Sequence, residues 1–228
     1  MSEISDTDAV KRSRVATRHK LVEQAVPVFV AKGLEAASVA ELCAAAGFTR
    51  GAFYSNFSSK TELAVAVYES RVDGLVALLD TEVDRQLSTD QPVATMLAFV
   101  LEAVSGLAQD GAWQGFRMEL HLAADRDPLL RSAVDAQYER LVSAVAEMLL
   151  RVRRRGVSYR VPEPDLARIL LAVWDGELLR TGRRLTAQDG TGRRLITATW
   201  NAFVDMDQTS ATDQTPTMDR APAMDQPT

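Results

Sequence analysis

The amino-acid sequence predicts an all-α protein of about nine helices, and three observations support this. Apolar residues recur every three or four positions in most segments, which is the spacing of one helix face. Serine and threonine residues stand where such patterns begin, as helix N-caps do. Neither an alternating apolar run nor an Asn-Gly turn signals β structure.

The chain is expected to begin with a basic flexible arm, residues 1–16. A first helix then spans about 17–32, with Gly33 in the position that ends a helix in the left-handed conformation. Pro27 lies inside this helix and is expected to bend it, because proline removes one backbone hydrogen bond.

Two short helices follow, and their ends are closely specified. Ser38 and Glu41 have capping-box spacing and begin a second helix that ends at Gly47. Thr49 is a natural N-cap for a third helix, which closes near Phe57. Two short helices joined by a tight turn have the layout of a helix-turn-helix, the unit that places its second helix in the DNA major groove.

The rest of the chain reads as longer helices, each with an apolar stripe. The first begins at Ser59, which has a glutamate three residues further on, and a later one begins at Asp127-Pro128. These helices are expected at 60–86, 92–109, 112–124, 127–155, 164–181 and 191–204.

The last segment, residues 205–228, differs in character. Met-Asp-Gln and related triplets recur there every six residues among Thr and Pro. Such sequence buries too little apolar surface to fold, so an acidic disordered tail is expected. The predicted organisation is therefore an arm (1–16), a homeodomain-like helix-turn-helix domain (17–60), a larger helical domain (61–204) and the tail.

Charge is distributed unevenly along the chain. The whole protein carries a net charge of -5, yet residues 9–60 hold eight Lys or Arg against three acids. A basic unit on an acidic body suggests that only this unit meets a polyanion.

Other classes of protein are disfavoured. No apolar run approaches the roughly 18 residues needed to span a membrane, and no signal peptide is recognisable, so a cytoplasmic protein without membrane contact is expected. Cys43 is the single cysteine and reads as a buried apolar side chain. Neither histidine, His19 or His121, has metal-ligand spacing from it, so neither a metal nor another cofactor is expected.

The helix-turn-helix carries the residue types that DNA recognition requires. Arg50 is the long base-reading side chain, with guanine as its natural partner. Hydroxyls and amides at helix starts can hold phosphates, and Gly51 leaves room for the DNA backbone. The residues predicted to bind DNA are Ser38, Thr49, Arg50, Gly51, Tyr54, Ser55, Asn56 and Lys60. Singly, some have structural alternatives: Gly51 in packing, Tyr54 in the core and Lys60 as a solvated charge.

Residues 21–67 resemble the N-terminal domain of TetR/AcrR-type transcriptional regulators. The shared pattern is met by Phe29, Gly33, Ser38, Ala46, Gly47, Thr49, Arg50, Gly51, Phe53, Tyr54, Phe57, Lys60 and Leu63. Residues 119–131 and Asp175-Gly176 are similar, more loosely, to the C-terminal domains of that family. Asn56 departs from the pattern, because the family usually has His at this position, and this difference could change a phosphate contact.

The resemblance implies a homodimer in which the last two helices of each subunit form a four-helix bundle, and a small-molecule effector bound within the larger domain. The wide apolar stripes of those two helices agree with it. Dimer contacts are expected from Leu166, Leu170, Trp174, Leu178, Ile196, Trp200 and Phe203. Candidates for the ligand pocket are Trp113, Phe116, Glu119, His121, Tyr138 and Trp174.

The function predicted is a ligand-responsive transcriptional regulator, and specifically a repressor that binds a palindromic operator in double-stranded DNA and is released by its effector. The alternatives are an activator of the same fold, a ligand-carrying protein with a vestigial helix-turn-helix, and an enzyme. The sequence offers no nucleophile-base pair, phosphate-binding Gly loop or metal set for catalysis, so a protein without enzymatic activity is expected.

Overall fold

The structure, a computed structural model, describes residues 3–89, 91, 111–181 and 191–206. These residues contain eight α-helices and two strands of three residues each, so the predicted all-α class is confirmed with a small addition. The helix expected over 92–109 and residues 207–228 of the expected tail lie outside the described part of the chain.

The head, residues 17–60, contains the C-terminal half of α1 (Glu3–Lys32), then α2 (Val39–Ala46) and α3 (Arg50–Tyr54). The long helix α1 ends where its sequence predicts: Gly33 has a φ of 85°, and its amide donates to the Phe29 carbonyl at 2.7 Å. The first helix continues through Pro27 as one helix.

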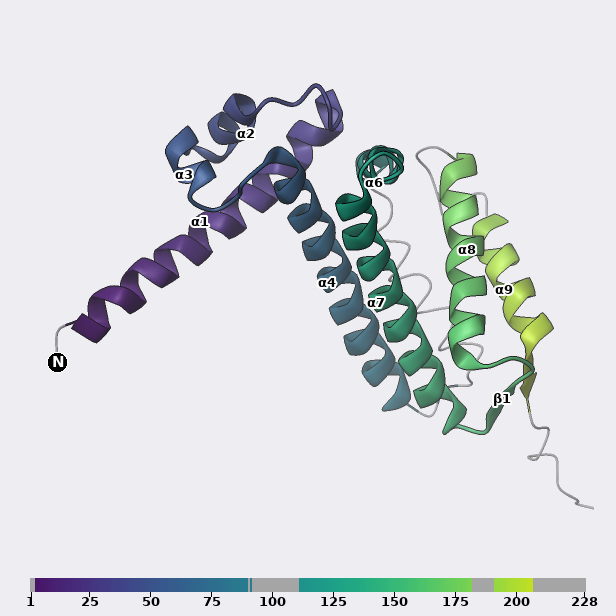
Figure 1. Ribbon diagram of the computed structural model, residues 1–228. Coiled ribbons are helices and arrows are strands. Elements are labelled where there is room, and N and C mark those ends of the chain that lie inside the picture. The colour runs from purple at the N-terminus through teal and green to yellow at the C-terminus, as the bar shows by residue number, and fades with distance from the viewer. Residues whose placement is uncertain (1–2, 90, 92–110, 182–190, 207–228) are drawn as a thin grey trace, which may run out of the picture.

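The beginning of α1 corrects the expected flexible arm. The structure describes residues 3–16 as regular helix, continuous with the part of α1 in the head. The sequence explains this, because the segment lacks Gly and Pro and has Glu3, Asp6 and Asp8 near the positive end of the helix dipole. This part of α1 projects away from the head and the body (Figure 1).

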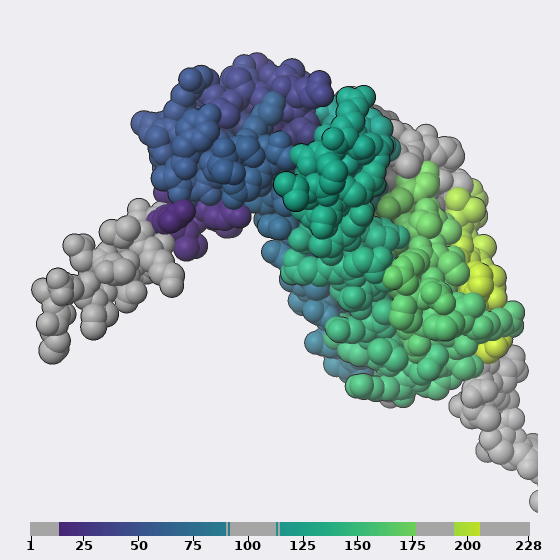
Figure 2. All heavy atoms as spheres, viewed as in Figure 1, coloured from purple at the N-terminus to yellow at the C-terminus, as the bar shows by residue number. Residues whose placement is uncertain are grey.

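The body consists of α4 (Lys60–Leu87), α6 (Gly111–Ala124), α7 (Pro128–Arg153), α8 (Glu163–Thr181) and α9 (Thr191–Phe203). Helix α4 packs on α7, α7 on α8 and α8 on α9, while α6 packs on both α7 and α1. Figure 2 shows α6 at the junction between the head and the rest of the body. In the described part of the chain, no helix is long and apolar enough to cross a membrane.

The two strands, β1 (Val157–Tyr159) and β2 (Val204–Met206), form an antiparallel pair that the sequence did not predict. They join segments almost fifty residues apart, so no local hairpin signal marks them. Strand β2 also places Asp205 and Met206 in regular structure, which moves the start of the expected tail beyond residue 206. Arg160 holds this pair by an ion pair with Asp205.

The hydrophobic core divides into two clusters, and their division differs from the predicted domain boundary at residue 60. The first cluster joins the head to the first half of α4, to α6 and to the start of α7. The second joins the second half of α4 to α7, α8, α9 and the two strands. The head therefore shares its core with α6, and cannot move far without disturbing it.

Candidate functional site

The α2–α3 turn is built by its capping residues. The Ser38 hydroxyl accepts from the Glu41 amide at 3.3 Å, and the Glu41 carboxylate accepts from the Ser38 amide at 3.0 Å, which completes the predicted capping box. Gly47 ends α2 with a φ of 71°. The Thr49 hydroxyl then accepts from the Ala52 amide at 3.1 Å and starts α3.

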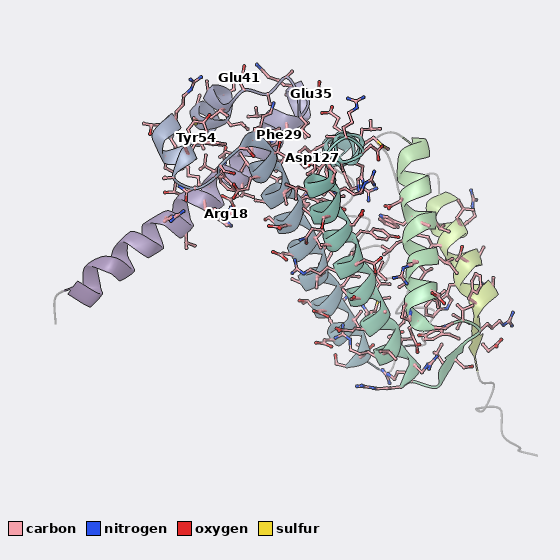
Figure 3. All side chains as sticks on the ribbon, viewed as in Figure 1. Arg18, Phe29, Glu35, Glu41, Tyr54 and Asp127 are labelled. Atoms are coloured by element: carbon pink, nitrogen blue, oxygen red, sulfur yellow. The ribbon has the colours of Figure 1, made fainter. Side chains whose placement is uncertain are left out.

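Helix α3 presents the predicted DNA-binding residues on its outer side. Thr49, Arg50, Gly51, Tyr54 and Ser55 are all exposed, with Tyr54 at 57%. On the inner side Phe53 and Phe57 are buried, and their rings lie 5.9 Å apart. The Tyr54 ring packs edge-on against Phe53 at 5.2 Å, so its hydroxyl is carried on a fixed ring. Figure 3 shows Tyr54 on α3, at the side of the head away from the body.

Gly51 is not required by the packing of the protein. A Cβ atom at this position would meet only the Thr49 hydroxyl, at an ordinary contact distance of 3.7 Å, and the backbone of Gly51 has no positive φ. The packing alternative for this glycine is therefore unsupported. The space that its missing side chain leaves faces outward, where a DNA backbone would lie.

Asn56 closes the C-terminal end of α3. Its side-chain amide donates to the Ala52 carbonyl at 2.8 Å and to the Ser55 hydroxyl at 3.2 Å, and its Oδ1 atom is buried without a partner among the described residues. These contacts give Asn56 a structural role at the end of α3, which is independent of any contact with a phosphate.

Two other side chains predicted to contact phosphates, those of Lys60 and Ser38, already have hydrogen-bond partners within the protein. The Lys60 ammonium donates to the carbonyls of Glu35 and Ala37, at 2.7 and 2.9 Å, and so holds the α1–α2 loop. The Ser38 hydroxyl donates to Glu41, whose carboxylate also binds Lys32. The Lys32 and Ser38 contacts lower the pKa of Glu41 to about 2. An anion near Ser38 would meet this carboxylate.

Two cations of α1 lie against the two ends of α3, the recognition helix of the helix-turn-helix, and neither is among the residues predicted to bind DNA. The Arg18 guanidinium lies 4.4 Å from the centre of the Phe57 ring, after α3, and the Lys20 ammonium lies 5.5 Å from the Phe48 ring, before α3. Figure 3 shows Arg18 on α1, close to the α3 end of the head. Only the fold brings these residues to α3, because nothing in their spacing relates them to it.

Three of the predicted pocket residues come together in the body, around Tyr68. The Trp113 ring stacks on Tyr68 at 5.8 Å, and His121 lies edge-on to Tyr68 at 6.1 Å. Tyr138 on α7 belongs to the same group of charges and hydroxyls, since Asp175 and Arg117 act on the pKa of both tyrosines. We call Tyr68, Trp113, Arg117, His121, Tyr138 and Asp175 the polar cluster.

An ion pair links the polar cluster across the body. Arg117 on α6 lies 2.9 Å from Asp175 on α8, and the two side chains are only 16% and 28% exposed. Burial, and then the charge of Arg117, lowers the pKa of His121, so its imidazole is neutral near pH 7. Burial raises the pKa of Tyr68 and Tyr138. The polar cluster thus combines aromatic faces with neutral hydroxyls, an imidazole and a charged pair.

The other predicted pocket residues have different surroundings. Phe116 is buried and stacks on Phe29 of α1 at 5.3 Å, while the Glu119 carboxylate accepts from the Leu34 amide in the head. Glu119 therefore faces the head, which corrects its expected role as a ligand contact. Phe116 lies between the head and the polar cluster, because its ring centre is also 5.5 Å from that of Trp113, and its ligand contact stays a prediction. Trp174 is half-buried and packs against the second core cluster.

Four of the predicted dimer contacts also need correction. Leu166, Leu170, Ile196 and Trp200 are all at least 91% buried in the core of the subunit itself, so they are not available to a partner. Trp174 and Phe203 pack against the same core but are only partly buried, so their dimer contacts stay predictions. The side chain of Leu178 lies outside the described part of the structure. The buried residues of the α8 and α9 stripes thus belong to the core of their own subunit.

Comparison with known proteins identifies both parts of the chain. Residues 21–67 match the family model for bacterial regulatory proteins of the tetR family. Residues 88–205 match the model for the C-terminal domain of tetracyclin-repressor-like proteins. The two matches together cover the head and most of the body.

Individual relatives agree with the family models. The chain is 26% identical to the HTH-type transcriptional repressor DhaR of Mycobacterium sp. (strain GP1), over 74% of this chain and 83% of DhaR. It is 31% identical to the HTH-type transcriptional regulator CymR of Pseudomonas putida, over 62% of this chain and 68% of CymR. A crystal structure described as a TetR-family transcriptional regulator from Mesorhizobium loti has the same fold, with a TM-score of 0.71 and 18% identity over 83% of this chain and 98% of that one.

Proposed function

Because this chain belongs to the TetR family of bacterial transcriptional regulators, we propose that it is a repressor that binds a palindromic operator as a dimer and is released by a small-molecule effector. Regulators of this family are not enzymes, and DNA binding controlled by a ligand is their typical role. The proposal assigns DNA recognition to the head, and effector binding and dimerisation to the body. It places the protein in the bacterial cytoplasm, where operators lie.

The observation that carries the proposal is the exposed outer side of α3. Arg50, Gly51 and Tyr54 face outward there, while two buried phenylalanines fix the helix on the head. Arg50 reads guanine in the major groove, Tyr54 and Thr49 hold phosphates, and Gly51 lets the DNA backbone approach. If the two half-sites are one helical turn apart, the two α3 helices of the dimer must lie roughly 34–36 Å apart to bind both of them.

The experiment that tests the proposal is selection of a binding site from a pool of random duplexes, followed by footprinting. A regulator of this kind enriches one palindrome and protects two half-sites. Equal retention of all sequences at every salt concentration would contradict the proposal, since a regulator must prefer its operator to other DNA.

The proposed effector site is the polar cluster. It joins helices α4, α6, α7 and α8, so a ligand bound there would contact the helix that supports the head. A compound that releases the operator should change the fluorescence of Trp113, and Tyr138→Phe or His121→Ala should weaken that release without changing operator affinity. Unchanged response in both variants would place the effector elsewhere.

The structure suggests how such a ligand would reach the head. Three residues close together on α6 connect the body to the head. Arg117 pairs with Asp175 in the body, while Phe116 and Glu119 contact the head. A ligand that displaces Asp175 from Arg117 would release one side of α6 and change how the head is held. In the proposal, effector binding favours a dimer whose two heads no longer match successive major-groove faces.

The proposed dimer surface is the outer face of α8 and α9, opposite to the buried stripes. Leu195 is 44% exposed there, and the small residues Ala198 and Ala202 follow it on the same face of α9. Ala198→Arg should convert the dimer to monomers in sedimentation velocity, whereas Ala136→Arg, on an exposed position of α7, should not. A dimer of undiminished stability in the Ala198→Arg variant would exclude this face.

The alternative of an activator is separated from a repressor by a reporter gene. If the protein is a repressor, its deletion raises expression of a reporter gene controlled by its operator. If it is an activator, its deletion lowers that expression.

A further inference from the structure

We propose that the projecting part of α1 is a second DNA-binding element, which places Lys11 and Arg14 against phosphates beside the sequence read by α3. This inference rests on the proposed operator binding, which it extends from the helix-turn-helix to a segment outside it. The binding partner of this element is the phosphate backbone of the same duplex.

The first observation is the charge of this segment. Residues 9–20 contain five Lys or Arg side chains and no acid, in a protein whose net charge is -5. In a helix, positions 11, 14 and 18 lie three and four residues apart and therefore share one face. We call Lys11, Arg14 and Arg18 the α1 stripe. Arg14 is exposed, as are its neighbours Val15 and Ala16.

The second observation fixes the direction of the α1 stripe. Arg18, at its C-terminal end, lies over Phe57 at the α3–α4 turn, and the charge of Arg18 lowers the pKa of Glu62 at the start of α4. The face of α1 that carries the stripe is thus the face that meets the end of the recognition helix. From Arg18 toward its N-terminal end, helix α1 extends away from the head and the body (Figure 1).

The third observation is the distance that the projecting part of α1 spans, compared with the spacing of base pairs in DNA. A helix rises about 1.5 Å per residue, so Arg14 lies roughly 6 Å, and Lys11 roughly 10 Å, beyond Arg18 along the axis of α1. DNA rises about 3.4 Å per base pair, so this distance corresponds to about three base pairs. A regular helix holds these charges in place, whereas a flexible arm would lose conformational entropy on binding.

A competing occupant is a second copy of this chain, whose body is acidic. Contacts with phosphates predict an effect on DNA binding and its salt dependence. Contacts with a partner subunit predict an effect on dimer stability instead. The two are separated by measuring both quantities on the same variants.

The test uses the full-length dimer, the selected operator and an unrelated duplex of equal length, over a series of salt concentrations. In Lys11→Ala/Arg14→Ala, the dimer loses two phosphate contacts from each subunit, four in all. The slope of log Kd against log salt should therefore decrease by about 3.6, because each lost phosphate contact contributes about 0.9. The decrease should be equal for both duplexes, since phosphate contacts carry no sequence information. The control Arg126→Ala/Arg154→Ala removes two exposed charges from the body and should leave the slope unchanged.

A second variant tests the helix itself. Ala16→Pro keeps every charge but interrupts α1 between Arg14 and Arg18, and it should reduce the slope as the double variant does, whereas Ala16→Ser should not. Hydroxyl-radical protection should shrink by about three base pairs beside each half-site in both affected variants.

Unchanged salt slopes in Lys11→Ala/Arg14→Ala would overturn the inference, and so would a loss of dimer stability with unchanged slopes. A full slope in Ala16→Pro would overturn the claim that a rigid helix positions the charges. The proposed function fails separately, if the wild-type protein itself selects no operator.

Discussion

The ring of Phe29, near the end of α1, stacks on the ring of Phe116 in α6, with centroids 5.3 Å apart and ring planes 25° apart. Three residues further along α6, Glu119 accepts from the Leu34 amide, and a Cβ atom on Gly33 would come within 2.9 Å of that carboxylate. One helix of the body thus contacts the end of α1 through an aromatic stack and a charged hydrogen bond.

Glu119 should matter for the transmission of the effector signal. Glu119→Ala leaves the partly buried Leu34 amide without its acceptor, which should lower the free energy of unfolding by about 1–3 kcal/mol and weaken effector-induced release. Glu119→Gln keeps an acceptor oxygen and should restore most of both. Urea unfolding and operator release measure the two effects, with Glu147→Ala, at an exposed position of α7, as the control. Normal release in Glu119→Ala would show that the signal does not pass through this contact.

Gly51→Ala should separate DNA binding from folding. The added methyl group meets nothing closer than 3.7 Å within the protein, and alanine favours the helix, so thermal stability should be equal or slightly higher. Operator affinity should fall by about tenfold or more, which is about 1.4 kcal/mol, because the methyl group stands where the DNA backbone approaches. Gly74→Ala, at an open position of α4, is the matched control and should bind normally. Full operator affinity in Gly51→Ala would remove this glycine from the DNA interface.

Lys60 is expected to act on stability more than on DNA recognition. Lys60→Ala leaves the Glu35 and Ala37 carbonyls without their donor, and should cost about 1–2 kcal/mol in urea unfolding. Arg50→Ala removes an exposed charge from the same domain and should cost almost nothing. If the two variants are equally stable, the predicted role of Lys60 at the α1–α2 loop is wrong.

Acid should destabilise the head through Glu41. The pKa of its carboxyl group falls from 4.5 to about 2 on folding, mainly because of Lys32 and Ser38, so its contribution to stability is present above pH 4.5. That contribution is lost as the pH falls from 4.5 to 2, because the unfolded state then binds the proton first. Glu41→Gln should therefore flatten the dependence of stability on pH in this window. A parallel pH dependence in the wild type and the variant would contradict the assignment.

The sequence was sufficient for those features that short-range chemistry determines. Gly33, Gly47 and the capping serines and threonine end or begin helices where their residue types predict, because each acts on the backbone within four residues. The exposed side of α3 was predictable for the same reason, since Phe53 within α3 and Phe57 just after it mark the inner side.

Contacts between distant segments could not be predicted in this way. A helical period shows which face is apolar, but not whether the subunit itself or a partner covers it, and this is why Leu166 and Trp200 were assigned to the dimer interface. Glu119 has the polar side chain expected of a ligand site, yet the fold directs it to the head. The Arg117–Asp175 pair joins residues almost sixty positions apart, and no local pattern indicates it.

The most direct test of the account is the sequence preference of Arg50→Ala, measured by selection from random duplexes beside the wild type. Loss of one bidentate contact should cost about 1–3 kcal/mol of discrimination at one position of each half-site. Salt-dependent binding, dimer stability and melting temperature should stay at wild-type values. Recovery of the same palindrome with undiminished preference would contradict the claim that α3 reads the operator through Arg50.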